Sequence, residues 1–275
     1  MIDQAAIANL PRAHREELLS LLIERERRVM GRKWLTYYPD EGPLRRELYP
    51  KHMAFFAAGQ KYQQRMFMAA NRVGKTEGVG AYEVALHMTG VYPKWWKGKR
   101  FTKPTRGWAA GDTRQTVRDI LADKLLGPKD ARGTGMLPVD SLLRIVPQPG
   151  VPDGVEAVFV QHKSGGVSRL GFKSYDQGRL SFQGTEQDFI WLDEEPPADV
   201  YEECLTRTAT TKGLMLLTFT PLSGLSDVVM SFLPGGDIRD CTDEASSRFV
   251  IMATWDDVPH LDERVKEMLF ASYMP

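Results

Sequence analysis

The residues best suited to chemistry form the segment AANRVGKT at positions 69 to 76. The phosphate-binding loop of nucleotide-hydrolysing enzymes has the pattern G-x-x-x-x-G-K-[ST]. Gly74, Lys75 and Thr76 match it, whereas Ala69 stands where the first glycine would be. In such a loop the glycine lets the backbone approach the phosphates, the lysine reaches the β- and γ-phosphates, and the threonine hydroxyl ligates magnesium. The segment therefore predicts binding of ATP with Mg²⁺.

The sequence on either side of this loop supports the same interpretation. Residues 65 to 70 predict a short buried strand, and Gly74 is expected to open a helix that runs to about Met88. A helix start presents unpaired backbone N–H groups and the positive end of the helix dipole to an anion. The alternative is an ordinary strand-to-helix turn. The residues expected to bind nucleotide are Ala69, Ala70, Asn71, Arg72, Val73, Gly74, Lys75 and Thr76.

A pair of acids follows another apolar run, FIWLDEE at positions 189 to 195. We expect Asp193 to lie at the tip of a strand and, with Thr76, to ligate the metal. Glu194 would polarise the attacking water, so the pair predicts hydrolysis rather than binding alone. The alternative is a strand end that carries two solvated acids.

The segment LTFTP at positions 217 to 221 ends a further apolar strand. A hydroxyl there, from Thr218 or Thr220, can sense the γ-phosphate if the strand ends beside the loop. Strands often end in such residues, so this indication is weaker than the two above.

Two arginines are candidates for stabilising the charge that builds on the transferred phosphoryl group. Arg72 lies in the loop and Arg179 precedes the acidic strand, while Arg118 and Arg169 are alternatives. Taken singly, each of the four fits an ordinary surface arginine better than this role. Gln60, upstream of the loop, is our candidate for the adenine contact.

Apolar strands alternate with helices along the chain, which predicts an α/β fold with a mostly parallel sheet between helices. Further strands are expected at GWAAG, at GLMLLTFTP and at RFVIMATW, and a small β-hairpin insertion around the pair Gly165-Gly166. Loops are expected over residues 36 to 51 and 128 to 154, and helices over residues 12 to 30, after Asp112 and in HLDERVKEMLFAS. We divide the chain into a helical segment with linker, 1–50, and a core with a carboxy-terminal lid or linker helix, 51–275.

The charge balance neither supports nor excludes nucleic-acid binding, because 36 basic residues match 36 acidic ones. A local site is offered by KWWKGKRFTKPTR at positions 94 to 106, with six basic residues and no acid. The alternative is a solvated loop whose tryptophans pack on the domain. The two cysteines, Cys204 and Cys241, predict no zinc site, and neither a membrane span nor a secretory signal is expected.

Taken together and in this order, these elements resemble the large subunit of tailed-bacteriophage terminases. AANRVGKT is similar to the family's phosphate loop, FIWLDEEPP to its metal-and-base motif, and LTFTP to its coupling motif. GFKSYDQGRLSFQGTEQDFIWLDEE and ATWDDVPHLDE also resemble family segments, so that the resemblance covers roughly residues 45 to 270.

The resemblance implies an ASCE-type P-loop ATPase that hydrolyses ATP to move double-stranded DNA into a procapsid. Lys75, Thr76, Asp193 and Glu194 would carry the roles given above, and Thr218 or Thr220 would couple hydrolysis to movement. The partners implied are a portal protein, a small terminase subunit and further copies of the chain in a ring, which the family suggests is pentameric. The isolated domain would be a monomer.

The family also places this activity in the host cytoplasm, transiently at the portal vertex, and adds a nuclease domain of RNase H type. Because this sequence ends at Pro275, we expect the nuclease domain to be absent and the chain not to cut DNA. Two other functions remain open at this stage. One is a helicase-like DNA-remodelling ATPase, and the other is a non-hydrolysing nucleotide-binding module of capsid assembly.

Overall fold

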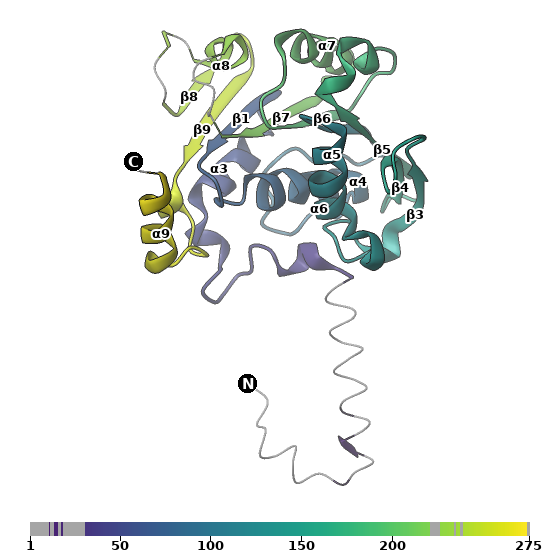
Figure 1. Ribbon diagram of the computed structural model, residues 1–275, viewed down its shortest axis with the longest axis vertical. Helices are drawn as coiled ribbons and strands as arrows, with labels where there is room; N and C mark the ends of the chain where they lie inside the picture. The colour runs from purple at the N-terminus through teal and green to yellow at the C-terminus, as the bar shows by residue number, and fades with distance from the viewer. Residues whose placement is uncertain are drawn as a thin grey trace.

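The computed structural model describes residues 31–220, 226–233, 235–236 and 239–273, together with residues 11, 14, 15 and 18. Apart from residues 14, 15 and 18, the helix expected over residues 12 to 30 therefore lies outside the described residues, as does Pro221. Within the described part, helices and strands alternate along the chain (Figure 1).

One sheet organises the molecule, and its order in the described residues is β3-β4-β5-β2-β6-β7-β1-β9-β8. The run from β5 to β9 is parallel, whereas β3, β4 and β8 pair antiparallel at the two sides. The predicted α/β fold with a mostly parallel sheet is thus confirmed. The strands are β1 (Gln64–Ala69), β2 (Arg106–Gly111), β3 (Leu142–Pro147), β4 (Val155–Gln161), β5 (Val167–Ser174), β6 (Phe189–Asp193), β7 (Leu214–Phe219), β8 (Cys241–Asp243) and β9 (Arg248–Ala253).

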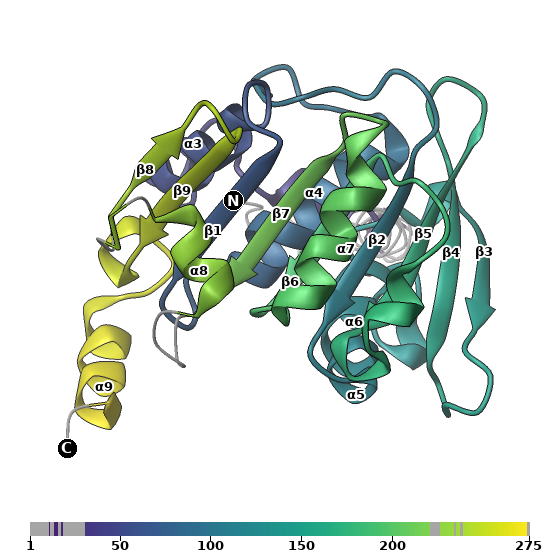
Figure 2. The ribbon, with the colours of Figure 1, turned by 90° about the horizontal axis from the view of Figure 1, so that it is seen from above.

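Helices cover both faces of the sheet, which explains why its central strands are almost entirely apolar. Figures 1 and 2 show α7 and α8 on one face and α3, α4, α5 and α6 on the other. A π-helical segment, Lys75–Ala81, leads into α4 and confirms the helix expected to start at Gly74. The helices are α3 (Pro50–Ala58), α4 (Tyr82–Thr89), α5 (Arg114–Thr116), α6 (Asp123–Leu126), α7 (Ala198–Ala209), α8 (Asp227–Phe232) and α9 (Glu263–Tyr273).

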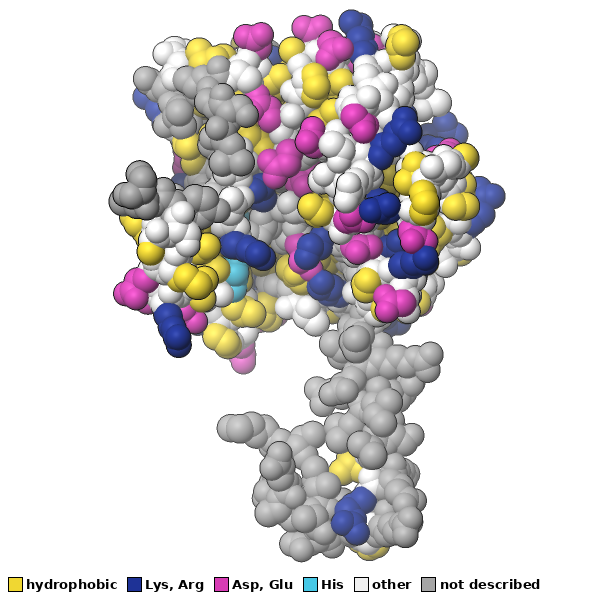
Figure 3. Space-filling model, in the orientation of Figure 1, with side chains coloured by type: hydrophobic (Ala, Val, Ile, Leu, Met, Phe, Trp, Pro, Cys, Tyr) yellow, Lys and Arg dark blue, Asp and Glu magenta, His cyan; other side chains and the backbone are white. Residues whose placement is uncertain are grey.

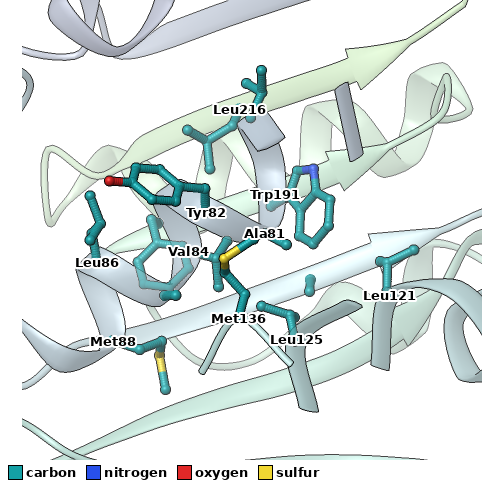
Figure 4. Close-up of a cluster of buried hydrophobic side chains, with 14 of the residues drawn as sticks. Ala81, Tyr82, Val84, Leu86, Met88, Leu121, Leu125, Met136, Trp191 and Leu216 are labelled. Carbon is teal, nitrogen blue, oxygen red and sulfur yellow. The ribbon is translucent and has the colours of Figure 1, made fainter. Parts of the chain in front are cut away.

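The helix that follows the phosphate loop is packed closely on the sheet. Figure 4 shows Tyr82, Val84 and Leu86 among the buried side chains around Trp191. Gly80 lies so close to the Trp191 ring that a Cβ there would be 2.2 Å from Cε2 of the indole. Only glycine fits, and the start of the helix is thereby fixed against β6.

Three local expectations were wrong or incomplete. Residues 128 to 154 were expected to be a loop, but β3 lies within them and extends the predicted β4–β5 hairpin to three strands. β3 ends in Pro147 and has two register irregularities, as edge strands tolerate. The structure also contains α7 between β6 and β7, which the sequence pattern did not reveal, and α3, which begins with Pro50 where a loop was expected.

Candidate functional site

The predicted loop lies at the carboxyl edge of the sheet, between the end of β1 and the segment Lys75–Ala81. Gly74 has φ of 90°, a left-handed conformation that side chains other than glycine rarely adopt. Arg72 also has positive φ, 68°, and its side chain is exposed. Alternation of right- and left-handed residues turns successive backbone N–H groups toward one point and forms an anion-binding nest.

The side chain of Lys75 is buried and directed at the end of β7. Its ammonium donates hydrogen bonds to Oγ1 of Thr220 and, at 3.4 Å, to Oδ1 of Asn71. It also lies 3.5 Å from Oε1 of Glu194. The loop lysine, one coupling threonine and the candidate base therefore meet at one place.

The two expected metal ligands are in direct contact. Oγ1 of Thr76 lies 3.0 Å and 3.2 Å from the two carboxylate oxygens of Asp193. Burial raises the pKa of Asp193 to about 7, although hydrogen bonds from Thr218 and Thr76 lower it. A hydroxyl beside a carboxylate supplies hard oxygen ligands of the kind that Mg²⁺ takes in addition to phosphates and water. These residues fit a magnesium nucleotide.

Glu194 is held in a strained backbone conformation at the end of β6. Its φ is 62°, a value that costs on the order of 1 kcal/mol or more for a residue with a side chain. Its N–H donates to the Thr218 carbonyl at 2.9 Å, and the buried hydroxyl of Tyr175 lies 3.1 Å from the carbonyl oxygens of both Asp193 and Glu194. The carboxylate is part-exposed, so water can reach it.

A cavity of about 670 Å³ opens beside the loop. That size suits a nucleotide. Glu77, the residue after Thr76, lies on its wall and pairs with Lys33 and Lys124. Burial raises the pKa of Glu77, but its hydrogen bonds with the two lysines outweigh burial and lower the value to about 2. The remaining wall is largely aromatic and apolar, with Tyr37, Tyr38, Leu44, Tyr49, Ile120, His260 and Leu261.

The structure brings most of the predicted residues together, but Gln60 and some of the candidate arginines have other surroundings. Gln60 follows α3 and precedes β1, so it lies at the opposite end of β1 from the loop and away from this cavity. Arg179 pairs with Glu203 of α7, Nε to Oε2 at 3.0 Å, and is not part of the cluster around Lys75. Arg118 pairs with Asp119 beside it in sequence.

Three ring side chains next to the loop were not identified from the sequence. His52, Trp255 and His260 each contact a backbone carbonyl of the loop. Trp255 follows β9, which pairs with β1 in parallel register. The position of Trp255 beside the loop could therefore be predicted only if the pairing of β9 with β1 were known.

The basic segment 94 to 106 lies at the amino edge of the sheet, because it leads into the start of β2. Trp96 is buried in the domain and Trp95 is half-buried, as the alternative interpretation of this segment expected. Figure 3 shows Lys and Arg side chains mixed with Asp and Glu over the face in view.

The part of the chain that the structure describes contains no group of three or more His, Cys, Asp or Glu side chains that could hold a metal ion. The described helices are all too short or too polar to span a bilayer.

Comparison with known proteins agrees with this geometry. The family model described as "Terminase large subunit, T4likevirus-type, N-terminal" matches residues 66–275. The terminase large subunit of Salmonella phage P22 is 36% identical over 289 residues, which cover 98% of this chain and 54% of that protein. The terminase large subunit of Enterobacteria phage LP7 is 37% identical over 82 residues, which cover 30% of this chain and 16% of that one.

A solved structure shares the fold. The large terminase from a thermophilic bacteriophage, in complex with ADP, superposes with a TM-score of 0.57 at 16% identity over 82% of this chain and 50% of that chain. The chain thus spans about half the length of the phage P22 protein and of the thermophilic phage protein. Because the family model matches residues 66–275 and the phage P22 protein is 36% identical over 98% of this chain, the chain belongs to the family of phage terminase large subunits.

Proposed function

We propose that this chain is the ATPase motor domain of a terminase large subunit and hydrolyses ATP, with Mg²⁺, to translocate double-stranded DNA into a procapsid. The observation that carries the proposal is the convergence of Lys75, Thr76, Asp193 and Glu194 at one edge of the sheet. The cavity beside them, and the ADP bound to the thermophilic phage terminase of the same fold, support a nucleotide ligand.

Each of these side chains has a role that follows from its position. Lys75 exchanges its bonds to Thr220 and Asn71 for the β- and γ-phosphates when ATP binds. Thr76 and Asp193 would hold magnesium, which when bound neutralises charge on the phosphate oxygens. The base and sugar would occupy the aromatic cavity, which Gln60 does not line, so the proposed adenine contact lies in this cavity and not at Gln60.

Glu194 is the proposed general base. It follows Asp193 directly and its carboxylate is part-exposed, so it can accept the proton of the water that attacks the γ-phosphorus. Its ion pair with Lys75 keeps the carboxylate close to the loop lysine. Thr220 contacts both Lys75 and Glu194, so it is better placed than Thr218 to couple hydrolysis to movement.

We also propose the finer assignments that the family suggests. The partners would be a portal protein, a small terminase subunit and further copies of the chain in a pentameric ring, and the chain would act in the host cytoplasm, transiently at the portal vertex. We propose further that these 275 residues do not cleave DNA. The arginine that stabilises the transferred phosphoryl group would be Arg72 within a subunit or Arg179 across to a neighbour. An isolated domain would then turn over slowly, and its specific activity would rise with protein concentration if the arginine acts across subunits.

The test is an ATPase assay with a parallel measurement of ADP affinity. Lys75→Ala should lose both binding and turnover, because the phosphates lose their cation. Glu194→Gln should bind ADP as the parent does, but its turnover should fall by at least about 100-fold, a typical contribution of a general base. Glu195→Gln, the neutralised next acid along, serves as the matched control and should retain turnover.

Turnover that survives Glu194→Gln would exclude hydrolysis by this cluster. Binding without turnover in the parent, at every concentration of protein and DNA, would favour the non-hydrolysing assembly module. Stimulation by single-stranded rather than double-stranded DNA would favour a helicase-like enzyme.

A further inference from the structure

Three successive carbonyl oxygens of the phosphate loop each face a ring nitrogen from a different part of the chain. Nε1 of Trp255 lies 2.8 Å from the Asn71 oxygen, Nε2 of His260 lies 2.8 Å from the Arg72 oxygen, and Nε2 of His52 lies 3.1 Å from the Val73 oxygen. A carbonyl oxygen can only accept, so each ring nitrogen carries the proton.

The direction of these bonds determines where the loop's own donors point. In a trans peptide the N–H lies opposite the C=O, and the described residues contain no cis peptide bond. Holding the carbonyls of residues 71, 72 and 73 toward the rings therefore turns the N–H groups of residues 72, 73 and 74 the other way. Those are the donors that a phosphate needs.

Both imidazoles are themselves oriented by tyrosines. Nδ1 of His52 lies 2.7 Å from the Tyr38 hydroxyl, and Nδ1 of His260 lies 3.2 Å from the Tyr49 hydroxyl. Because Nε2 carries the proton in a neutral ring, Nδ1 of His260 can accept from the Tyr49 hydroxyl. The Tyr38 hydroxyl lies 2.7 Å from both Nδ1 of His52 and the Gly78 carbonyl oxygen, so it links the His52 ring to the backbone of the helix that follows the loop. The two rings also flank Gly74, whose absent Cβ would lie 3.4 Å from one and 3.8 Å from the other.

We propose that His52, Trp255 and His260 are positioning residues that hold the phosphate loop in its binding conformation before nucleotide arrives. They would offset the absence of the loop's first glycine, where Ala69 stands, by fixing the backbone from outside. The inference rests on the proposed function, since it assumes that the loop binds phosphate. It assigns no direct contact with nucleotide to the Trp255 indole or the His52 imidazole.

The test compares the affinity of each variant for ADP and for adenosine, measured by calorimetry with magnesium present. Trp255→Phe, His260→Phe and His52→Phe remove one ring donor each and keep a ring. Each should weaken ADP binding by about tenfold, which corresponds to about 1.4 kcal/mol and lies within the net contribution of one hydrogen bond. Adenosine, which has no phosphate, should bind Trp255→Phe as it binds the parent, because Trp255 does not line the cavity proposed for the base and sugar.

Gln places an amide N–H near the position of Nε2, so His260→Gln and His52→Gln should recover most of the ADP affinity. Trp96→Phe is the matched control, because it removes an indole N–H that donates to a carbonyl, Lys99 at 3.2 Å, away from the loop. Trp255 and His260 are at least partly exposed, so their variants test the inference even if His52→Phe does not fold.

Parent-like ADP affinity in folded Trp255→Phe and His260→Phe would overturn the inference, as would equal weakening of adenosine and ADP binding by Trp255→Phe. The proposed function fails separately. If Lys75→Ala binds ADP as the parent does, the loop is not a phosphate site; if Lys75→Ala loses ADP while the ring variants keep it, only the positioning role is wrong.

Discussion

The hydroxyl of Thr218 donates a 2.7 Å hydrogen bond to Oδ1 of Asp193, and both side chains are buried. The same hydroxyl accepts from Nε1 of Trp191 at 2.7 Å. Thr220, two residues further along, contacts Lys75 instead. Thr218 and Thr220, which the sequence offered as alternatives for one task, therefore have different partners: the first supports the acid and the second faces the lysine.

Replacing each threonine by valine should separate these roles. Thr218→Val leaves the Trp191 N–H buried without its acceptor, so we expect the free energy of unfolding to fall by about 1–3 kcal/mol. Thr220 lies at the edge of the site, so Thr220→Val should change the free energy of unfolding by no more than about 0.5 kcal/mol. ATP turnover should fall in this variant, because Thr220 contacts Lys75 and Glu194. Urea unfolding and an ATPase assay on both variants check this. A stability loss confined to Thr220→Val would contradict the structural assignment.

Much of this site could be predicted from local sequence. Apolar runs that end in Gly74-Lys75-Thr76, in Asp193-Glu194 and in Thr218 to Thr220 identify strand ends, and the carboxyl ends of parallel strands share one edge. Parallel pairing alone places the three segments at one edge of the sheet. They meet there because β6, β7 and β1 are neighbours in the sheet, which the sequence pattern does not reveal.

The remaining features depend on strand order and on side chains far apart in sequence. Gln60 was a plausible adenine contact by its distance from the loop along the chain, but β1 lies between them and carries it to the other edge of the sheet. Trp255 and His260 reach the loop only because β9 pairs with β1, which the hydrophobic pattern does not encode. Arg179 is likewise drawn to Glu203 by α7, a helix that the sequence did not reveal.

Gly80 should not tolerate even one added methyl group. Gly→Ala inside a helix usually stabilises a protein by about 0.5–1 kcal/mol, yet here the new Cβ would overlap the Trp191 ring. We expect Gly80→Ala to destabilise the domain by about 1–3 kcal/mol, as overpacked cores do. In a double-mutant cycle with Trp191→Leu, the two losses should be clearly less than additive. Additive losses in urea unfolding would show that the indole is not the obstacle.

A buried ion pair joins β1 to α4 and should be costly to break on one side only. Arg65 contacts Glu83 through Nη2 at 2.6 Å and Nη1 at 3.1 Å, and both side chains are fully buried. Glu83→Gln leaves the guanidinium without its counter-charge, so we expect a loss of about 3–5 kcal/mol. The double variant Arg65→Met/Glu83→Leu should lose less than Glu83→Gln, measured by urea unfolding. A larger loss in the double variant would rule out uncompensated charge as the cause.

His52 should make stability depend on pH. Burial, with a smaller contribution from His260, lowers the pKa of His52 to about 3 from its ordinary value of 6.5. The unfolded chain thus takes up a proton below pH 6.5 that the folded chain refuses, so stability is complete above that pH and falls as pH decreases toward 3. The slope approaches about 1.4 kcal/mol per pH unit. His52→Gln, compared by urea unfolding from pH 7 to pH 5, should show a correspondingly flatter profile; equal profiles would mean that His52 is not held neutral.

Tyr175 should matter for turnover rather than for binding. Its buried hydroxyl lies 3.1 Å from the carbonyl oxygens of Asp193 and Glu194, at the position where the backbone of Glu194 is forced to φ of 62°. Tyr175→Phe keeps the ring and removes only this restraint, so the strained turn can relax and carry the Glu194 carboxylate away from the attacking water. Displacements of about 1 Å can cost on the order of 100-fold in rate, and we expect kcat to fall by about 10-fold to 100-fold. The affinity for ADP should stay at the parent value, because the loop and Lys75 are untouched.

The control is Tyr201→Phe, which removes a hydroxyl on the same face of the sheet. That hydroxyl contacts Gln64 and not the site. A fall in ADP affinity that parallels the fall in kcat would show that Tyr175 supports the whole site and not the position of the base.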